Sequence, residues 1–91
     1  MKKEYVLKSE LKKFIKERLQ TRMYFLKQMA EGGGYQGNAQ GVKQLASKGT
    51  FNSIIRAYHS AIVSYLDVAK RFEIPMENKL AKEARQFADI F

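Results

Sequence analysis

Apolar residues recur at spacings of three and four along most of the chain, which is the period of an α-helix with one buried face. The first such segment, residues 8–31, predicts a long amphipathic helix with Ser9 as its N-cap. Phe14, Phe25 and Met29 widen its apolar stripe, so we expect them at the edge of the core. The residues that form the centre of the stripe are Leu11, Ile15, Leu19, Met23, Leu26 and Ala30.

A glycine-rich stretch interrupts this pattern, because five of the six glycines fall between positions 32 and 41. Glycine readily adopts the left-handed conformation that follows the last turn of a helix, so the first helix should end here. We predict a loop over residues 32–38, followed by a short helix over 39–48 with Asn38 as its cap. Val42, Leu45 and Ala46 should face the core, which leaves Lys43 on the polar side.

Residues 50–73 carry the most regular apolar repeat, and this repeat predicts a second long helix capped by Thr50. Its stripe is broad enough to contact neighbours on two sides, which is typical of a helix at the centre of a bundle. The residues that share this stripe are Phe51, Ile55, Tyr58, Ile62, Tyr65, Ala69 and Phe72.

A final helix is predicted over residues 75–90, with Pro75 at its first position, where the missing N–H of proline matters least. Apolar residues again follow helical spacing in this segment, and Phe87, Ile90 and Phe91 could form an exposed patch that docks a partner. The residues of the predicted stripe are Met76, Leu80, Ala84, Phe87 and Phe91.

Together these segments predict an all-α fold, because no part of the chain shows the period of two that strands require. Residues 1–91 should form a single helical domain. We expect a small antiparallel helical bundle of three long helices plus one short helix after the glycine-rich loop. A domain this small buries a thin core, so association into a homodimer is a reasonable expectation.

Charge is distributed unevenly along the chain, whose formal net charge is +8. Residues 1–31 hold nine Lys or Arg against four Glu, residues 32–60 hold three basic residues and no acid, and residues 61–91 are balanced. Clustered positive charge is typical of contact with phosphates. We expect the basic side chains to share one surface, with Tyr35 of the loop placed to stack on a base or to cover the core. The candidate nucleic-acid contacts are Lys8, Lys12, Lys13, Lys16, Arg18, Arg22, Lys43, Lys48 and Arg56.

Catalytic and metal chemistry find little support in the residue types. The chain has no cysteine and a single histidine, His59, and its acids alternate with bases along polar faces. Gly32–Gly37 matches the dinucleotide pattern G-x-G-x-x-G, but a helix rather than a strand precedes it. We therefore predict no enzymatic activity, no cofactor, no metal site and no small-molecule substrate. The absence of cysteine and of a long apolar run favours a cytoplasmic protein that does not bind membranes.

Two functions remain. The first is a nucleic-acid-binding accessory or regulatory protein that contacts phosphates through the first helix and the loop. The alternative is a protein-interaction module, such as a small inhibitor, adaptor or assembly chaperone, that docks a partner through its helical surface.

Overall fold

Helices make up most of the described chain, and no strand occurs within residues 2–49 and 51–91, which are the residues that the structure describes. This structure is a computed structural model, and its side chains are described from Leu7 onward except at position 50. The all-α prediction is confirmed.

Helix α1 spans Lys2–Gly32 and therefore begins earlier than the predicted start at residue 8. Ser9 lies inside the helix, so its predicted role as an N-cap is wrong. The helix ends at the glycines, as expected, where Gly34 adopts a φ of 87°. The N–H of Tyr35 donates to the carbonyl of Ala30 at 2.9 Å, which satisfies an acceptor of the last turn.

Helix α2 spans Ala39–Ser47 and is capped by Asn38, as predicted. The side-chain oxygen of Asn38 accepts a hydrogen bond from the N–H of Gly41 at 2.9 Å, which satisfies a donor of the first turn. Val42, Leu45 and Ala46 are buried, so the predicted inward face of this short helix is confirmed.

Helix α3 spans Asn52–Arg71, a range slightly shorter than the predicted 50–73. The predicted cap, Thr50, lies outside the described residues. Phe51 immediately precedes the helix, adopts a φ of 60° and makes no side-chain capping bond. At the other end, the N–H of Ile74 donates to the carbonyl of Ala69 at 2.8 Å, and Glu73 adopts a φ of 52°.

Helix α4 spans Asn78–Ala88, so the prediction that it begins at Pro75 and is a third long helix is wrong. Residues 74–77 form a non-helical connection in which Ile74 is buried and Pro75 is exposed. The chain buries Ile74 before it turns, and this delays the start of the helix to Asn78. With 11 residues, α4 is close in length to α2 rather than to α3.

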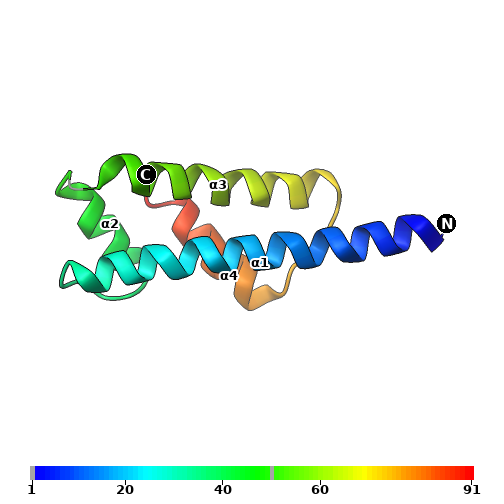
Figure 1. Cartoon of the computed structure of the whole chain (residues 1–91), viewed down its shortest axis with the longest axis horizontal. Helices are drawn as coiled ribbons and strands as arrows, with labels where there is room; N and C mark the ends of the chain where they lie inside the picture. Colours follow the sequence, from blue (N-terminus) through cyan, green and yellow to red (C-terminus); the bar gives the residue numbers. More distant parts are fainter. Residues whose placement is uncertain (1, 50) are drawn as a thin grey trace.

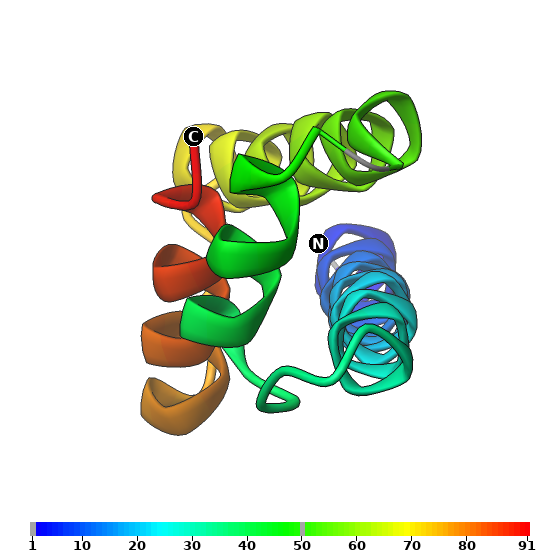
Figure 2. The ribbon, with the colours of Figure 1, turned by 90° about the vertical axis from the view of Figure 1, so that its left-hand side faces the viewer.

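The four helices form two layers. Helices α1 and α3 lie antiparallel and side by side, and the first turns of α1 extend beyond the end of α3 (Figure 1). Figure 2 shows α2 and α4 next to each other, both crossing the α1–α3 pair at a steep angle on the same side. The opposite side of the pair is left uncovered by α2 and α4.

The core lies between these two layers. Most predicted core positions are buried, but Phe51 and Phe72, which lie just outside the two ends of α3, are each 57% exposed, so their predicted place in the core is wrong. Phe91 is also exposed, and Ile90 is buried in its place. Phe87 is also fully buried, so the predicted docking patch formed by Phe87, Ile90 and Phe91 is wrong. The buried side chains that α1 contributes are Ile15, Leu19, Met23, Leu26 and Ala30. Those from the rest of the chain are Val42, Leu45, Ala46, Ile55, Ile62, Ala69, Ile74, Leu80, Ala84, Phe87 and Ile90.

Candidate functional site

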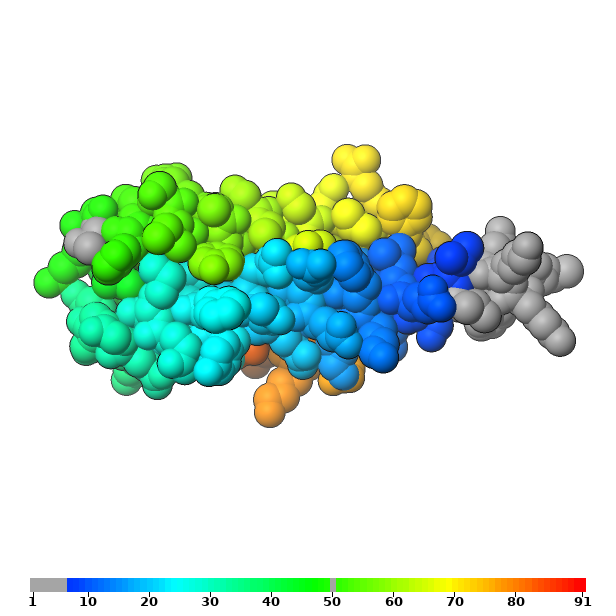
Figure 3. Space-filling view, in the orientation of Figure 1, coloured from blue at the N-terminus to red at the C-terminus, as the bar shows by residue number. Residues whose placement is uncertain are grey.

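Aromatic and arginine side chains gather where α1 and α3 meet on the uncovered side of the pair. Figure 3 shows this side, with α1 and α3 in front and α4 visible only beyond the edge of α1. Phe14 and Phe25 are 44% and 45% exposed, although the sequence pattern placed them at the edge of the core. We refer to this group as the α1–α3 seam, and its residues are Phe14, Arg18, Arg22 and Phe25 of α1 with Tyr58 and Tyr65 of α3.

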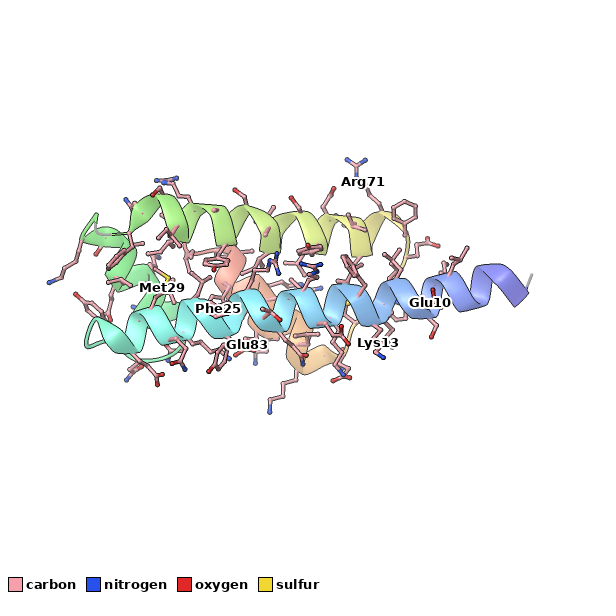
Figure 4. The ribbon with its side chains drawn as sticks, in the orientation of Figure 1. Glu10, Lys13, Phe25, Met29, Arg71 and Glu83 are labelled. Atoms are coloured by element: carbon pink, nitrogen blue, oxygen red, sulfur yellow. The ribbon has the colours of Figure 1, made fainter. Side chains whose placement is uncertain are left out.

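The rings of the seam pack across the two helices in pairs. Phe25, which is labelled on the near side of α1 in Figure 4, stacks on Tyr58 with ring centroids 6.1 Å apart and planes at 22°. Phe14 meets Tyr65 edge to face, also at 6.1 Å. Tyr58 and Tyr65 are partly buried and also pack against the core. Packing against the core therefore holds the rings in place on one side, while their outer surfaces face solvent.

The two arginines lie between these ring pairs, and each places its guanidinium group near an aromatic ring. The guanidinium of Arg18 is 4.9 Å from the centroid of Phe14, and that of Arg22 is 5.7 Å from the centroid of Tyr65. Both distances fall within the range of about 6 Å at which a cation is attracted to an aromatic face. The Nε of Arg22 is buried and has no hydrogen-bond partner among the described residues.

Further apolar residues extend the seam along both helices. On α1, Leu7 and Leu11 precede Phe14 and Met29 follows Phe25, each at a spacing of three or four. The residues of α3 that continue the tyrosine row at the same spacing are Ile54, Ala61 and Val68, followed by Phe72 just after the helix. Among the described residues of these two rows none is acidic, and the charged residues within them are Arg18 and Arg22.

Lys12, Lys16 and Lys27 lie on the other flank of α1, toward α4. Lys16 forms an ion pair with Glu77 at 2.9 Å, and Lys27 forms one with Glu83 at 2.7 Å, so both tie α1 to the α4 region. Lys13 lies at the edge of α1 that points away from α3 (Figure 4). The hydrogen bond and the charge of Lys16, with a smaller contribution from the charge of Lys12, lower the pKa of Glu77 below its ordinary value.

We expect Lys16→Met to raise the pKa of Glu77 toward the ordinary value for glutamate, because the variant removes both the hydrogen bond and the neighbouring charge. Since folding lowers this pKa, the stabilisation is present above the pKa of the unfolded chain and is lost as the pH falls through the folded pKa. An NMR titration of the Glu77 carboxyl carbon measures the change, and Lys27→Met serves as the control. An unchanged Glu77 pKa in Lys16→Met would contradict this assignment.

The other candidate cations lie elsewhere. Lys43 and Lys48 belong to α2 and its C-terminal end, and the guanidinium of Arg56 stacks on Phe91 at 4.2 Å. The last turn of α1, after which the chain leads into α2, lies about 27 Å from Lys12 along the helix axis at 1.5 Å per residue. The lysines of α2 are therefore far from those near Lys12. Lys8 lies nearer still to the N-terminal end. The structure thus spreads the nine cations over several surfaces, and the expectation of one shared basic surface is wrong.

Tyr35 folds back on the bundle. Its ring is partly buried, packs against the core, and has the ammonium of Lys48 5.9 Å from its centroid. One of the two roles considered for Tyr35, covering the core, therefore matches its position.

Several hollows on the described surface lie beside α4 or its ends, away from the seam. A groove of about 570 Å³ between α1 and α4 is bridged by the Lys27–Glu83 pair. His59 bonds through Nε2 to the carbonyl oxygen of Ala88 at 2.8 Å, which ties α3 to the end of α4. Within the described residues, no three His, Cys, Asp or Glu side chains come together in a way that could hold a metal ion. No helix in this part of the chain is long and apolar enough to cross a membrane.

Comparison of the chain with protein-family models, with curated proteins and with solved structures gave no match.

Proposed function

We propose that this chain is a non-enzymatic protein-interaction module that receives a helix of a partner protein along the α1–α3 seam. The observation that carries this proposal is the row of half-exposed rings and arginines on the one side of the α1–α3 pair that α2 and α4 leave uncovered. The side chains on a helix surface form ridges and grooves, against which a further helix can pack its own side chains. Aromatic residues and arginine are also the types that contribute most to binding at protein interfaces.

The seam is suited to binding because its side chains are already ordered before a partner arrives. Phe14 and Phe25 pack on tyrosines that themselves contact the core, so their rotamers are restricted. A pre-ordered surface loses less side-chain entropy on association than a mobile one does. Contact with the apolar stripe of a partner helix would also remove the exposed ring surfaces of the seam from water. Burial of apolar surface is the main driving force of such association.

The experiment compares partner retention by three immobilised proteins in a nuclease-treated lysate of the source organism. These are the wild type, Phe25→Ser in the seam, and the control Val63→Ser. Val63 is 41% exposed, like Phe25, but lies on the side of α3 away from the seam. Proteins retained by the wild type are identified, purified and titrated against all three. We expect at least a tenfold weaker affinity for Phe25→Ser and an unchanged affinity for Val63→Ser.

Equal affinities of the wild type and Phe25→Ser would contradict the proposal, as would retention of no protein at all. Thermal unfolding of both variants separates a binding defect from a folding defect. Because Phe25 is only half-buried, its replacement should leave the fold intact.

Nucleic-acid binding is the second candidate, favoured by the net charge of +8 and by the small number of paired cations. Of the nine candidate cations, Lys16 alone is in an ion pair within the part of the chain whose side chains are described. The lysine set near Lys12 and the set near Lys43 are separated by more than the screening length of about 8 Å in physiological salt, so they would bind phosphates as independent patches. Titration with labelled duplex and single-stranded DNA and RNA, at about 50 and about 200 mM salt, tests this candidate. Absence of binding at the lower salt would exclude it.

A further inference from the structure

We infer that the partner helix is acidic and that Arg18 and Arg22 bind two of its carboxylates, one turn apart, beside an apolar stripe that covers the rings of the seam. This inference rests on the proposed function and specifies the chemistry of the partner. It starts from the way in which the two guanidinium groups are held.

Each guanidinium lies close to an aromatic ring, and this contact uses none of its hydrogen-bond donors. The guanidinium carbon of Arg18 is 4.9 Å from the centroid of Phe14, and that of Arg22 is 5.7 Å from the centroid of Tyr65. An arginine held in this way still has N–H groups that can donate to a carboxylate. Neither arginine forms an ion pair within the described residues, and the Nε of Arg22 is buried without a partner. The pair is therefore ordered but not neutralised.

The spacing of the arginines matches a helical ligand. Arg18 and Arg22 are four residues apart on α1, so they are separated by about 6 Å along its axis. Carboxylates at positions i and i+4 of a partner helix have the same separation. A helix that lies along the seam can thus meet both arginines at once, each through a bidentate pair. Its apolar positions would then contact the rings of Phe14 and Phe25.

Charge complementarity favours this occupant over the alternatives. In a symmetric dimer the same surface meets itself, so Arg18 and Arg22 of two copies would face each other with no acid of the seam to offset them. Single-stranded nucleic acid would need ring faces on which bases can stack. One face of Phe25 is already covered by Tyr58, and Phe14 is engaged by Tyr65 and Arg18. An acidic amphipathic helix satisfies both the arginines and the apolar rows.

The probe is a synthetic helical peptide with leucine along one stripe and glutamate pairs at i and i+4 on its flank. A matched peptide carries lysine in place of each glutamate. NMR titration follows the resonances of Phe14, Phe25, Tyr58 and Tyr65 and gives the affinity for each peptide. We expect the glutamate peptide to shift these resonances and to bind at least about tenfold more tightly than the lysine peptide.

A matched pair of double variants separates local recognition from the general effect of a positive net charge. Arg18→Met with Arg22→Met removes two charges from the seam, while Lys13→Met with Lys43→Met removes two charges from other surfaces. We expect the arginine variant to lose most of the preference for the glutamate peptide. The lysine double variant should keep this preference, because it loses the same net charge as the arginine double variant while the residues of the seam are unchanged.

Each other outcome would overturn the inference. Equal binding of both peptides at the seam would show an apolar groove without charge selection, and the proposed function would stand. Equal loss in both double variants would show non-specific attraction. A dimer in sedimentation that Phe25→Ser abolishes would identify a second copy as the occupant, and seam shifts caused by single-stranded RNA would identify nucleic acid. If neither peptide binds, the inference of an acidic partner helix is overturned. The proposed function is tested separately, because the retention experiment with Phe25→Ser and Val63→Ser does not use the peptides.

Discussion

Replacing Phe87 by alanine should reduce the free energy of unfolding by about 3–5 kcal/mol, the largest loss that we expect from any single substitution in this chain. Phe87 is 0% exposed and is the largest fully buried side chain among the described residues. It lies on α4, which packs against α3, α1 and α2, so the cavity would open where the two layers meet. Since small domains are stable by only about 5–15 kcal/mol, this loss would remove a large share of the total stability.

Urea denaturation followed by circular dichroism measures this change, with Phe91→Ala as the control. Phe91 is the same residue type four positions later, but it is 44% exposed and contacts Arg56 and His59 at the surface. Its replacement should cost no more than about 1.5 kcal/mol. Similar losses in the two variants would mean that the burial of Phe87 does not hold α4 on the bundle.

The periodicity of the sequence predicts the long helices well, because their burial follows directly from spacing. On α1, the repeat correctly predicts burial at residues 15, 19, 23, 26 and 30. On α3, it correctly predicts the burial of Ile55, Ile62 and Ala69. The cap at Asn38 is equally predictable, since its side chain satisfies a donor within the same turn. Each of these features is decided by residues that are close in the sequence.

The start of α4 was predicted less well because tertiary burial decides it. Pro75 is a good first residue for a helix, but the chain first buries Ile74 beneath the end of α3. Glu73 adopts a positive φ to make that turn, which a pattern of apolar spacings cannot reveal. Helix α4 therefore begins only at Asn78.

The seam was missed for a related reason. Spacing shows that Phe14 and Phe25 flank the core side of α1, but it does not show whether another element covers them. Both crossing helices pack on the same side of the α1–α3 pair, which leaves the other side of these broad stripes exposed. The sequence does contain a signal for the seam, namely the width of the apolar stripes on α1 and α3. A helix in a four-helix domain of this size cannot bury stripes as wide as these.

The distribution of basic residues along the sequence likewise predicts one shared basic surface, because these residues lie close together in the first two-thirds of the chain. A helix turns by 100° per residue, so neighbouring cations point in different directions. Lys12 and Lys16 face the α4 side, whereas Arg18 and Arg22 face α3. Charge counted along the chain therefore overstates the charge that any one partner meets, and this is why the rings and arginines of the seam are the stronger functional signal.

Replacing Gly41 by alanine should destabilise the domain by about 1–3 kcal/mol, although alanine is ordinarily favoured over glycine inside a helix by about 1 kcal/mol. Gly41 is buried in the first turn of α2, where the glycine loop passes over the helix. A Cβ at this position would collide with the carbonyl oxygen of Gln36 and would lie 2.8 Å from its carbonyl carbon. The loop cannot easily withdraw, because the carbonyl of Gln36 accepts a hydrogen bond from the N–H of Asn38 at 2.9 Å.

The control for this prediction is Gly32→Ala, made at the last residue of α1, where a Cβ would meet no atom within 4 Å. There the same substitution should be neutral or should stabilise the domain by up to about 1 kcal/mol, since nothing opposes the helix propensity of alanine. Urea denaturation of both variants gives the two free energies of unfolding. The opposite signs follow from contact with the Gln36 backbone alone, so a stability of Gly41→Ala equal to or above that of the wild type would show that the loop does not pack on α2 in this way.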